Sequence, residues 1–107
     1  HDDHKHFVLY QGVDVIGYSH IELLPNKKAL LHIITINEEN HSQGFGKYFL
    51  NLIEKWFKEK SYKSIHVQSS PSVLGFYKKN KYHSMAFNEG GEYHQNSKKT
   101  SIGKYLS

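Results

Sequence analysis

The chain has 107 residues, of which 37% are hydrophobic and 14% aromatic, enough for one folded domain with a single core over residues 1–107. The absence of cysteine excludes disulfides and thiolate metal sites and is compatible with the cytoplasm, and no apolar run approaches the roughly 20 residues of a membrane-spanning helix. The net charge of +4 favours anionic ligands such as nucleotide phosphates, but is too small to indicate nucleic-acid binding.

Residues 1–6 are polar and predict a disordered lead-in. Their three histidines lack a second ligand cluster that would complete a metal site. A helix with two histidines four residues apart, which would support a zinc site, is also absent from the sequence. We therefore expect no bound metal.

Three strands with short connections are predicted next. Apolar residues mark strands at 7–10 and 15–24, with a turn at 11–14 between them. Pro25 presets the backbone of a second turn, and 29–36 is apolar on both faces, as in a central strand. Sequential strands joined by short turns favour an antiparallel meander.

An amphipathic run from Gly46 to about Lys60 predicts a helix. The apolar face is expected to consist of Tyr48, Phe49, Leu52, Ile53, Trp56 and Phe57. The polar face is expected to carry Asn51, Glu54, Lys55, Lys58 and Glu59. A strand at 63–68 follows this helix and should therefore run parallel to the third strand.

Ser70 and Pro71 predict the start of a short second helix that ends near Asn80. Residues 82–87 and 101–106 are predicted as the last two strands, joined by a polar, glycine-containing loop. The chain shows no internal repeat and no linker that would divide it into two domains.

The turn between the third strand and the long helix contains Gly44 and Gly46. A strand, a glycine turn and a helix in succession leave several backbone N–H groups unpaired at the start of the helix. These groups and the positive end of the helix dipole favour an anion such as a phosphate. An ordinary tight turn explains the two glycines about equally well.

Two motifs in this order of elements resemble the GNAT acetyltransferases. The hexapeptide at 41–46, His-Ser-Gln-Gly-Phe-Gly, is similar to their acyl-CoA motif, Gln or Arg-x-x-Gly-x-Gly or Ala. The heptapeptide at 76–82, Phe-Tyr-Lys-Lys-Asn-Lys-Tyr, is similar to their Phe-Tyr-x-Lys-x-Gly-Phe. The chain departs from these patterns at His41, Lys81 and Tyr82. Asn80 is expected to take the left-handed conformation in place of the missing glycine.

The resemblance extends from Phe7 to Leu106 and implies an α/β (α+β) fold, with a mixed, mostly antiparallel sheet and two helices. The first strand and first two helices of the family have no counterpart here. We therefore expect that this N-terminal part is missing from the sequence or is supplied by another chain.

The resemblance also implies acetyl-CoA as the co-substrate. The backbone of Ile34, Thr35 and Ile36 would hold its pantetheine arm. The turn would hold its pyrophosphate through His41, Ser42, Gln43, Gly44, Phe45, Gly46 and Lys47. Ser70 takes a position at which many relatives carry a CoA-contacting asparagine, although a plain helix N-cap explains it as well.

Tyr77 matches the family tyrosine that protonates the departing CoA thiolate. Adjacent helical residues point about 100° apart, so Tyr77 can face the cofactor while Phe76 packs; a core aromatic is the alternative. His32 shares strand parity with Ile34 and Ile36 and is the candidate general base, because imidazole titrates near neutral pH. A structural histidine is the more common alternative. Glu38 and Glu39 suit the role less well, because they lie where the strand ends and are expected in solvent. Spacing does not rank the further candidates His20, Glu22 and His66.

The resemblance thus implies an acyl-CoA-dependent N-acetyltransferase in which an amine attacks the bound thioester directly. The acceptor amine, a small molecule or a protein, is not readable from the sequence, and a homodimer stays open. Two alternatives remain: a catalytically silent module that binds or senses acyl-CoA, and a nucleic-acid-binding domain that charge and tyrosines alone would support.

Overall fold

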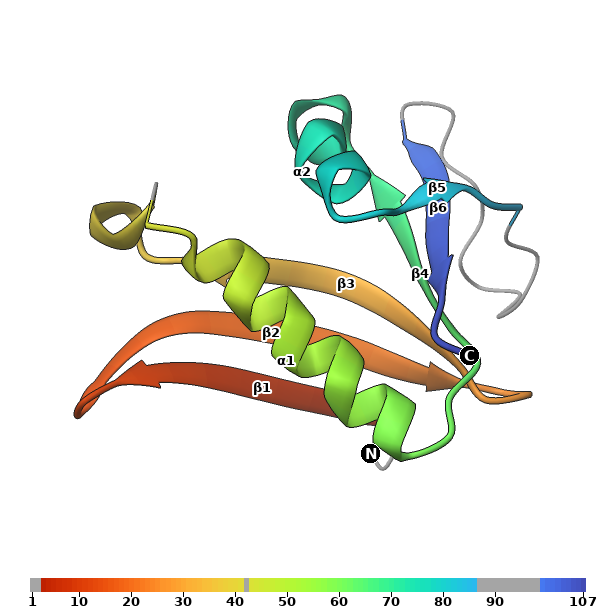
Figure 1. Cartoon of the computed structure of the whole chain (residues 1–107), viewed down its shortest axis with the longest axis horizontal. Coiled ribbons are helices and arrows are strands. Elements are labelled where there is room, and N and C mark those ends of the chain that lie inside the picture. The colour runs from red at the N-terminus through yellow and green to blue at the C-terminus, as the bar shows by residue number, and fades with distance from the viewer. Residues whose placement is uncertain (1–2, 42, 87–98) are drawn as a thin grey trace.

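The computed structural model describes residues 3–41, 43–86 and 99–107. In these ranges the chain forms one six-stranded sheet with the strand order β1-β2-β3-β4-β6-β5 (Figure 1). The first three strands are β1 (His4–Gln11), β2 (Asp14–Leu24) and β3 (Lys28–Ile36). They pair antiparallel in sequence order, which confirms the predicted meander.

The second half of the chain adds two helices and three strands. Helix α1 (Phe45–Glu59) leads to β4 (Ser64–Ser69), which pairs parallel with β3 as predicted. A 3₁₀ turn at Pro71–Val73 precedes α2 (Leu74–Lys79). Strand β6 (Thr100–Tyr105) lies between β4 and β5 (His83–Ser84). The strand predicted at 82–87 is thus reduced to two residues, with residue 87 outside the described part.

The disordered lead-in predicted for residues 1–6 is wrong for residues 4–6. His4 and His6 belong to β1, where they pair with Glu22 and His20 of β2. Both imidazole rings also stack on the His20 ring, with centroids 5.0 and 4.7 Å away. Cross-strand contacts that no local pattern reveals therefore extend the strand. Residues 1–2 lie outside the described residues.

The core lies between the sheet and the two helices. The largest fully buried apolar side chains are Phe57, Ile21, Leu31, Leu50, Ile53, Ile65 and Ile102. Burying each contributes roughly 1.5–3 kcal/mol. The face that α1 buries is rotated from the predicted one, because Leu50 is buried whereas Tyr48 and Leu52 are 54% and 42% exposed.

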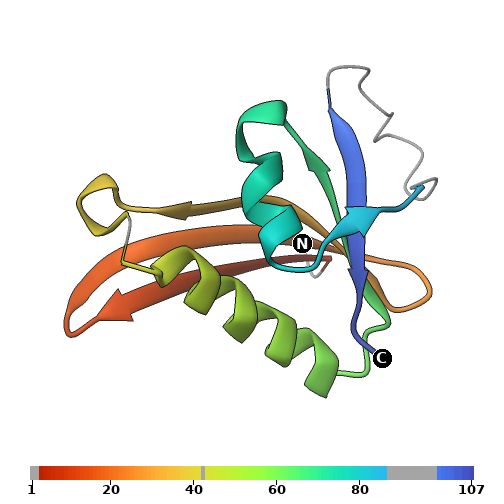
Figure 2. The ribbon, with the colours of Figure 1, turned by 45° about the horizontal axis from the view of Figure 1, so that its top comes forward.

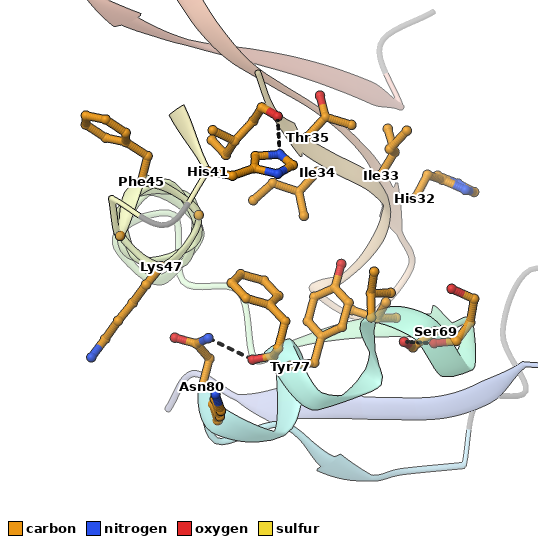
Figure 3. A pocket seen from close by; sticks show the side chains of 18 of the residues that line it. His32, Ile33, Ile34, Thr35, His41, Phe45, Lys47, Ser69, Tyr77 and Asn80 are labelled. Carbon is orange, nitrogen blue, oxygen red and sulfur yellow. Dashed lines mark hydrogen bonds between the residues drawn. The ribbon is translucent and has the colours of Figure 1, made fainter. Parts of the chain in front are cut away.

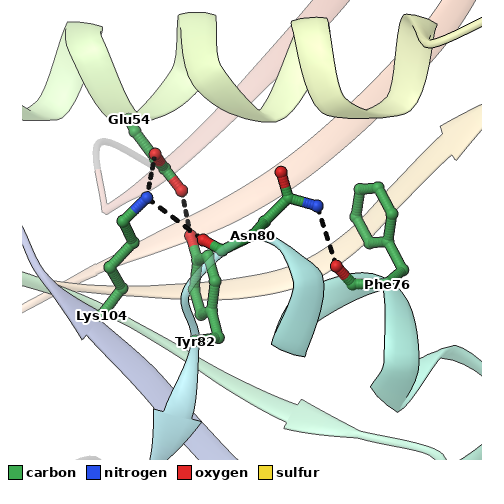
Figure 4. A network of polar contacts seen from close by, with 5 residues as sticks. All are labelled: Glu54, Phe76, Asn80, Tyr82 and Lys104. Atoms are coloured by element: carbon green, nitrogen blue, oxygen red, sulfur yellow. Dashed lines mark hydrogen bonds and ion pairs between the residues drawn. The ribbon is translucent and has the colours of Figure 1, made fainter.

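Glu54 was expected on the polar face of α1 but is buried in a polar network between α1, β6 and the residues after α2 (Figure 4). Its carboxylate accepts a hydrogen bond from the Tyr82 hydroxyl at 2.8 Å and one from Lys104 Nζ at 2.9 Å. Lys104 also donates to the carbonyl of Asn80. Burial, and then the Glu54 charge, raise the pKa of Tyr82. The network fixes α1 against the end of α2.

Lys81, not Asn80, takes the left-handed conformation after α2. Its φ is 76°, whereas Asn80 has φ −98° and ψ 22°, so the sequence-based expectation for Asn80 is wrong. The side-chain amide of Asn80 instead donates to the carbonyl of Phe76. A lysine therefore occupies, with steric strain, the conformation that the family pattern gives to glycine.

Replacing Lys81 by glycine is expected to raise the free energy of unfolding by up to about 1 kcal/mol, because relief of the Cβ clash exceeds the added freedom of the unfolded chain. Urea denaturation measures the change. Lys78→Gly, in α2, is the matched control and should lower stability by about 1 kcal/mol. Equal losses in both variants would show that the conformation at Lys81 is not strained.

Strands β3 and β4 pair only from Lys28–Ser64 to Leu31–Val67. Beyond that last pair they diverge, with β3 running on beside β2 and β4 running on beside β6 (Figure 2). The sheet therefore opens into a fork between two parallel strands, and the fork positions the candidate site.

Candidate functional site

A pocket of about 1060 Å³ occupies the fork (Figure 3). Its walls come from the end of β3, the turn into α1, the end of β4, and α2. The two motif segments that are far apart in the sequence thus line one cavity. Its volume suits a ligand of nucleotide-cofactor size.

One wall of the pocket is the edge of β3. Ile34, Thr35 and Ile36 pair with β2 on one side, and no described strand pairs with their other side. Ile34 points into the pocket and Thr35 points away from it (Figure 3). An open strand edge offers backbone N–H and C=O groups, so these residues can hold an extended ligand.

A β-bulge at His32 contradicts the expected strand parity. His20 pairs with Ile33 and Ile21 pairs with Leu31, which leaves His32 as the extra residue of β3. Ile34 and Ile36 consequently pack against the core that α1 covers. The His32 ring stacks on His20 instead and is directed away from Tyr77 (Figure 3). His32 lines the rim of the pocket but does not share a face with Ile34 and Ile36.

The turn into α1 presents backbone donors to the pocket. Gly44, the N-cap, has φ 79° and carries no side-chain cap. The first backbone bond of the helix is from Tyr48 N–H to Gly44 C=O. No described residue accepts a hydrogen bond from the N–H of Phe45, Gly46 or Lys47. These groups form a concavity that suits a phosphate.

His41 closes the turn against the end of β3. Its Nε2 donates to the carbonyl of Ile36 at 2.7 Å, while its ring lines the pocket (Figure 3). The imidazole therefore stabilises the path from the strand edge to the helix start. Beside it, Gln43 is exposed, with its amide 3.5 Å from the carbonyl of Glu39, and Ser42 lies outside the described residues.

Gly46 and Phe76 join the two motifs. A Cβ atom added at Gly46 would lie 3.2 Å from Cε1 of Phe76, tighter than an ordinary contact. Glycine at this position therefore lets α2 approach the first turn of α1. Phe76 itself packs against the core.

Tyr77 is 5% exposed, and its hydroxyl points into the pocket (Figure 3). No described residue forms a hydrogen bond with this hydroxyl. Burial raises the pKa of Tyr77 to about 12, so the phenol keeps its proton at neutral pH. It can act as a hydrogen-bond or proton donor to a group in the pocket.

Ser70, directly after β4, also lines the pocket. Its side chain makes no capping bond to the turn at Pro71–Val73, and its Oγ lies 3.2 Å from Oγ of Ser72. The N-cap explanation thus lacks its hydrogen bond.

Four histidines from three strands form a stack beside the pocket. The rings of His4 and His6 lie on His20, and His20 lies on His32 with centroids 4.8 Å apart. His32 Nε2 lies 3.0 Å from a carboxylate oxygen of Glu22. The sequence alone does not reveal the stack, because its members are distant along the chain. Among the residues that the structure describes, no group of three or more histidine, cysteine, aspartate or glutamate side chains is arranged to bind a metal.

Because of the histidine stack, we expect the folded protein to be less stable at acidic pH. Burial, and then the neighbouring histidines His32, His6 and His4, hold the pKa of His20 below its ordinary 6.5, while the charge of Glu22 acts in the opposite direction. The unfolded chain therefore binds more protons than the folded chain as the pH falls through 6.5, and the free energy of unfolding decreases over this range.

Urea denaturation at pH 7.5 and 5.5 measures the effect. His20→Phe keeps a ring in the stack but removes this titration, so the difference between the two pH values should shrink. A difference as large as that of the natural chain would contradict the prediction.

The remaining base candidates are less well placed. Glu38 and Glu39 are exposed on a 3₁₀ turn, outside the pocket lining. His66 is buried, with Nε2 2.8 Å from the Ser64 hydroxyl.

In the described ranges, no helix is both long and apolar enough to cross a membrane.

Comparisons with known proteins agree with this geometry. Residues 1–82 match the model of the acetyltransferase (GNAT) family. Tetrahymena GCN5 superposes with a TM-score of 0.87 at 14% identity, over 98% of this chain and 69% of that one. The PaiA N-acetyltransferase of Thermoplasma acidophilum, solved with coenzyme A, has a TM-score of 0.79 at 18% identity, over 96% and 61%.

The IAA acetyltransferase of Bacillus cereus is similar as well, with a TM-score of 0.77 at 17% identity, over 97% of this chain and 79% of that one. The chain thus spans about 60–80% of the length of these structures. No curated protein sequence matches it. The similar structures show the fold, and the family match over residues 1–82 shows that the chain belongs to the acetyltransferase (GNAT) family.

Proposed function

We propose that the chain is an acyl-CoA-dependent N-acetyltransferase that moves an acetyl group from acetyl-CoA to an amine. One observation carries the proposal: a single pocket joins an open strand edge, a set of unpaired helix N–H groups and a buried tyrosine hydroxyl. The strand edge suits the amide groups of pantetheine, and the helix start suits a pyrophosphate. These two features lie at successive points along β3 and the turn that follows it.

In the proposed reaction the amine nitrogen attacks the thioester carbonyl carbon, and the C–S bond then breaks. The amine loses one proton and the CoA sulfur gains one, so no covalent enzyme intermediate is needed. The neutral phenol of Tyr77 donates to the departing sulfur. Burial raises the pKa of Tyr77 to about 12, above the roughly 8.5 of a thiol. The phenol that has given its proton to the sulfur therefore regains one, and the proton released by the amine balances it.

Two further effects would accelerate the acetyl transfer. Holding both substrates in one pocket removes much of the entropy cost of their encounter. Backbone N–H groups at the β3 edge would polarise the thioester carbonyl. We assign the proton-accepting role to His32, at the rim of the pocket.

A module that binds acyl-CoA without turnover is the second candidate. The observation that favours it is the position of His32, which is hydrogen-bonded to Glu22 and directed away from Tyr77. The two candidates share the cofactor pocket and differ only in chemistry.

Two measurements on the chain test the proposal. Acetyl-CoA should raise the midpoint of thermal unfolding in a saturable way. Mass spectrometry of a panel of amines with acetyl-CoA should then detect an acetylated product. Stabilisation without any product would favour the silent module, and no stabilisation would contradict both candidates.

A further inference from the structure

Gln68 stands at the point where the fork opens. The last pair between β3 and β4 is Leu31 with Val67, so Gln68 is the first residue of β4 beyond it and His32 is the first of β3. Ile65 and Val67 face the core that the helices cover, so strand alternation places Gln68 on the opposite face. Gln68 and His32 therefore lie across the fork from each other, on the side away from α1.

The Gln68 side chain has an unused donor. Its Nε2 is buried and has no hydrogen-bond partner in the part of the chain that the structure describes, although the residue lines the pocket. The adjacent Ser69 hydroxyl, in contrast, donates to the carbonyl of Ser70. Buried amide groups in folded proteins are nearly always paired. An unpaired one at a pocket wall therefore points to a partner on a ligand.

We infer that Gln68 selects the acceptor by donating a hydrogen bond from Nε2 to an oxygen close to the reacting amine. The inference rests on the proposed function. Strands in a sheet are about 4.8 Å apart, and the fork widens from that spacing. An acceptor with its amine near His32 would direct a carbonyl oxygen on the next carbon across this opening toward Gln68. The acceptor class is thus α-amino-acyl compounds, such as amino-acid amides and peptide N-termini, rather than plain alkylamines.

A matched pair of acceptors tests the inference. Phenylalanine amide carries the carbonyl group and phenethylamine lacks it. One net hydrogen bond corresponds to a factor of roughly ten or less, so Gln68→Met should lower the ratio of the two kcat/KM values, amide over amine, by about that factor. Because ratios in two proteins are compared, the different basicity of the two amines cancels.

Gln11→Met provides the control, because Gln11 is an exposed glutamine at the end of β1, outside this pocket. It should leave the ratio unchanged. Stability gives an independent readout: Gln68→Met removes an unpaired buried amide and should raise the melting temperature of the unliganded protein by a few degrees, whereas Gln11→Met should not.

A ratio that is the same in the natural chain and in Gln68→Met, with both acceptors acetylated, would overturn the inference and leave the proposed function intact. A natural chain that acetylates neither acceptor nor any other amine would overturn the proposed function, and the inference would fall with it.

Discussion

Replacing Gly46 by leucine is expected to weaken acetyl-CoA binding by roughly 10- to 100-fold. A Cβ atom there would already lie 3.2 Å from the Phe76 ring, and the longer side chain would fill the space between α1 and α2 that the pocket uses. The leucine side chain must be displaced before the ligand can bind, and overpacking of this kind costs about 1–3 kcal/mol. The middle of that span corresponds to the stated loss, because each 1.4 kcal/mol is a factor of ten. Isothermal titration calorimetry measures the loss.

Two other glycines separate the possible causes of such a loss. Gly44→Ala adds a methyl group that meets no atom within 4 Å but must adopt φ 79°, so it tests the backbone of the turn without filling the pocket. Gly75→Ala, in α2 and outside the pocket, also meets no atom and should leave binding unchanged. Unaltered affinity in Gly46→Leu, with the fold intact by circular dichroism, would contradict the assignment of the turn as a phosphate site.

Local patterns predicted most of the fold. The three-strand meander, the long helix and the parallel crossover to β4 follow from hydrophobic periodicity and turn residues, which depend on a few neighbouring positions. The two motif segments could also be assigned to elements, because the predicted strand, turn and helices put Gly44 in the turn before the long helix and Phe76 in the short helix. What the motifs leave open is how the two segments meet, which here depends on the contact of Gly46 with Phe76.

Features that depend on distant residues were missed. The bulge at His32 reverses the parity of Ile34 and Ile36, and a one-residue insertion in a strand leaves no mark in an apolar run. Helical periodicity predicts Glu54 on the polar face of α1, yet Tyr82 and Lys104, from elsewhere in the chain, hold it inside. The strain at Lys81 likewise depends on the end of α2 and not on residue preference.

Gln68 illustrates the same limit within the candidate site. A glutamine in a strand after a helix has no signature of function in one sequence. Its proposed role depends on two structural features: the β3–β4 pairing ends at Leu31–Val67, and its buried Nε2 has no partner among the described residues. The cofactor side of the site could therefore be read from motifs, whereas the acceptor side requires the geometry of the fork.

Replacing Tyr77 by phenylalanine is expected to lower kcat by about 100-fold, at the lower end of the effect of a positioned acid. The hydroxyl points into the pocket and has no described partner, so its removal should leave both the free energy of unfolding and the affinity for acetyl-CoA nearly unchanged. Steady-state kinetics with a saturating amine, together with calorimetry for acetyl-CoA, measure the two effects separately.

Tyr82→Phe is the matched control, because Tyr82 is as deeply buried as Tyr77 but its hydroxyl donates to Glu54 at 2.8 Å. Its loss leaves a buried carboxylate with one partner fewer and should lower the free energy of unfolding by about 1–3 kcal/mol, with kcat nearly unchanged at a temperature where the variant stays folded. The two variants are thus expected to differ in opposite ways. Tyr77→Phe should lose activity and keep its stability, whereas Tyr82→Phe should lose stability and keep its activity. If Tyr77→Phe retains full kcat, the leaving thiolate is stabilised by another group; if it loses stability as Tyr82→Phe does, Tyr77 is a core residue.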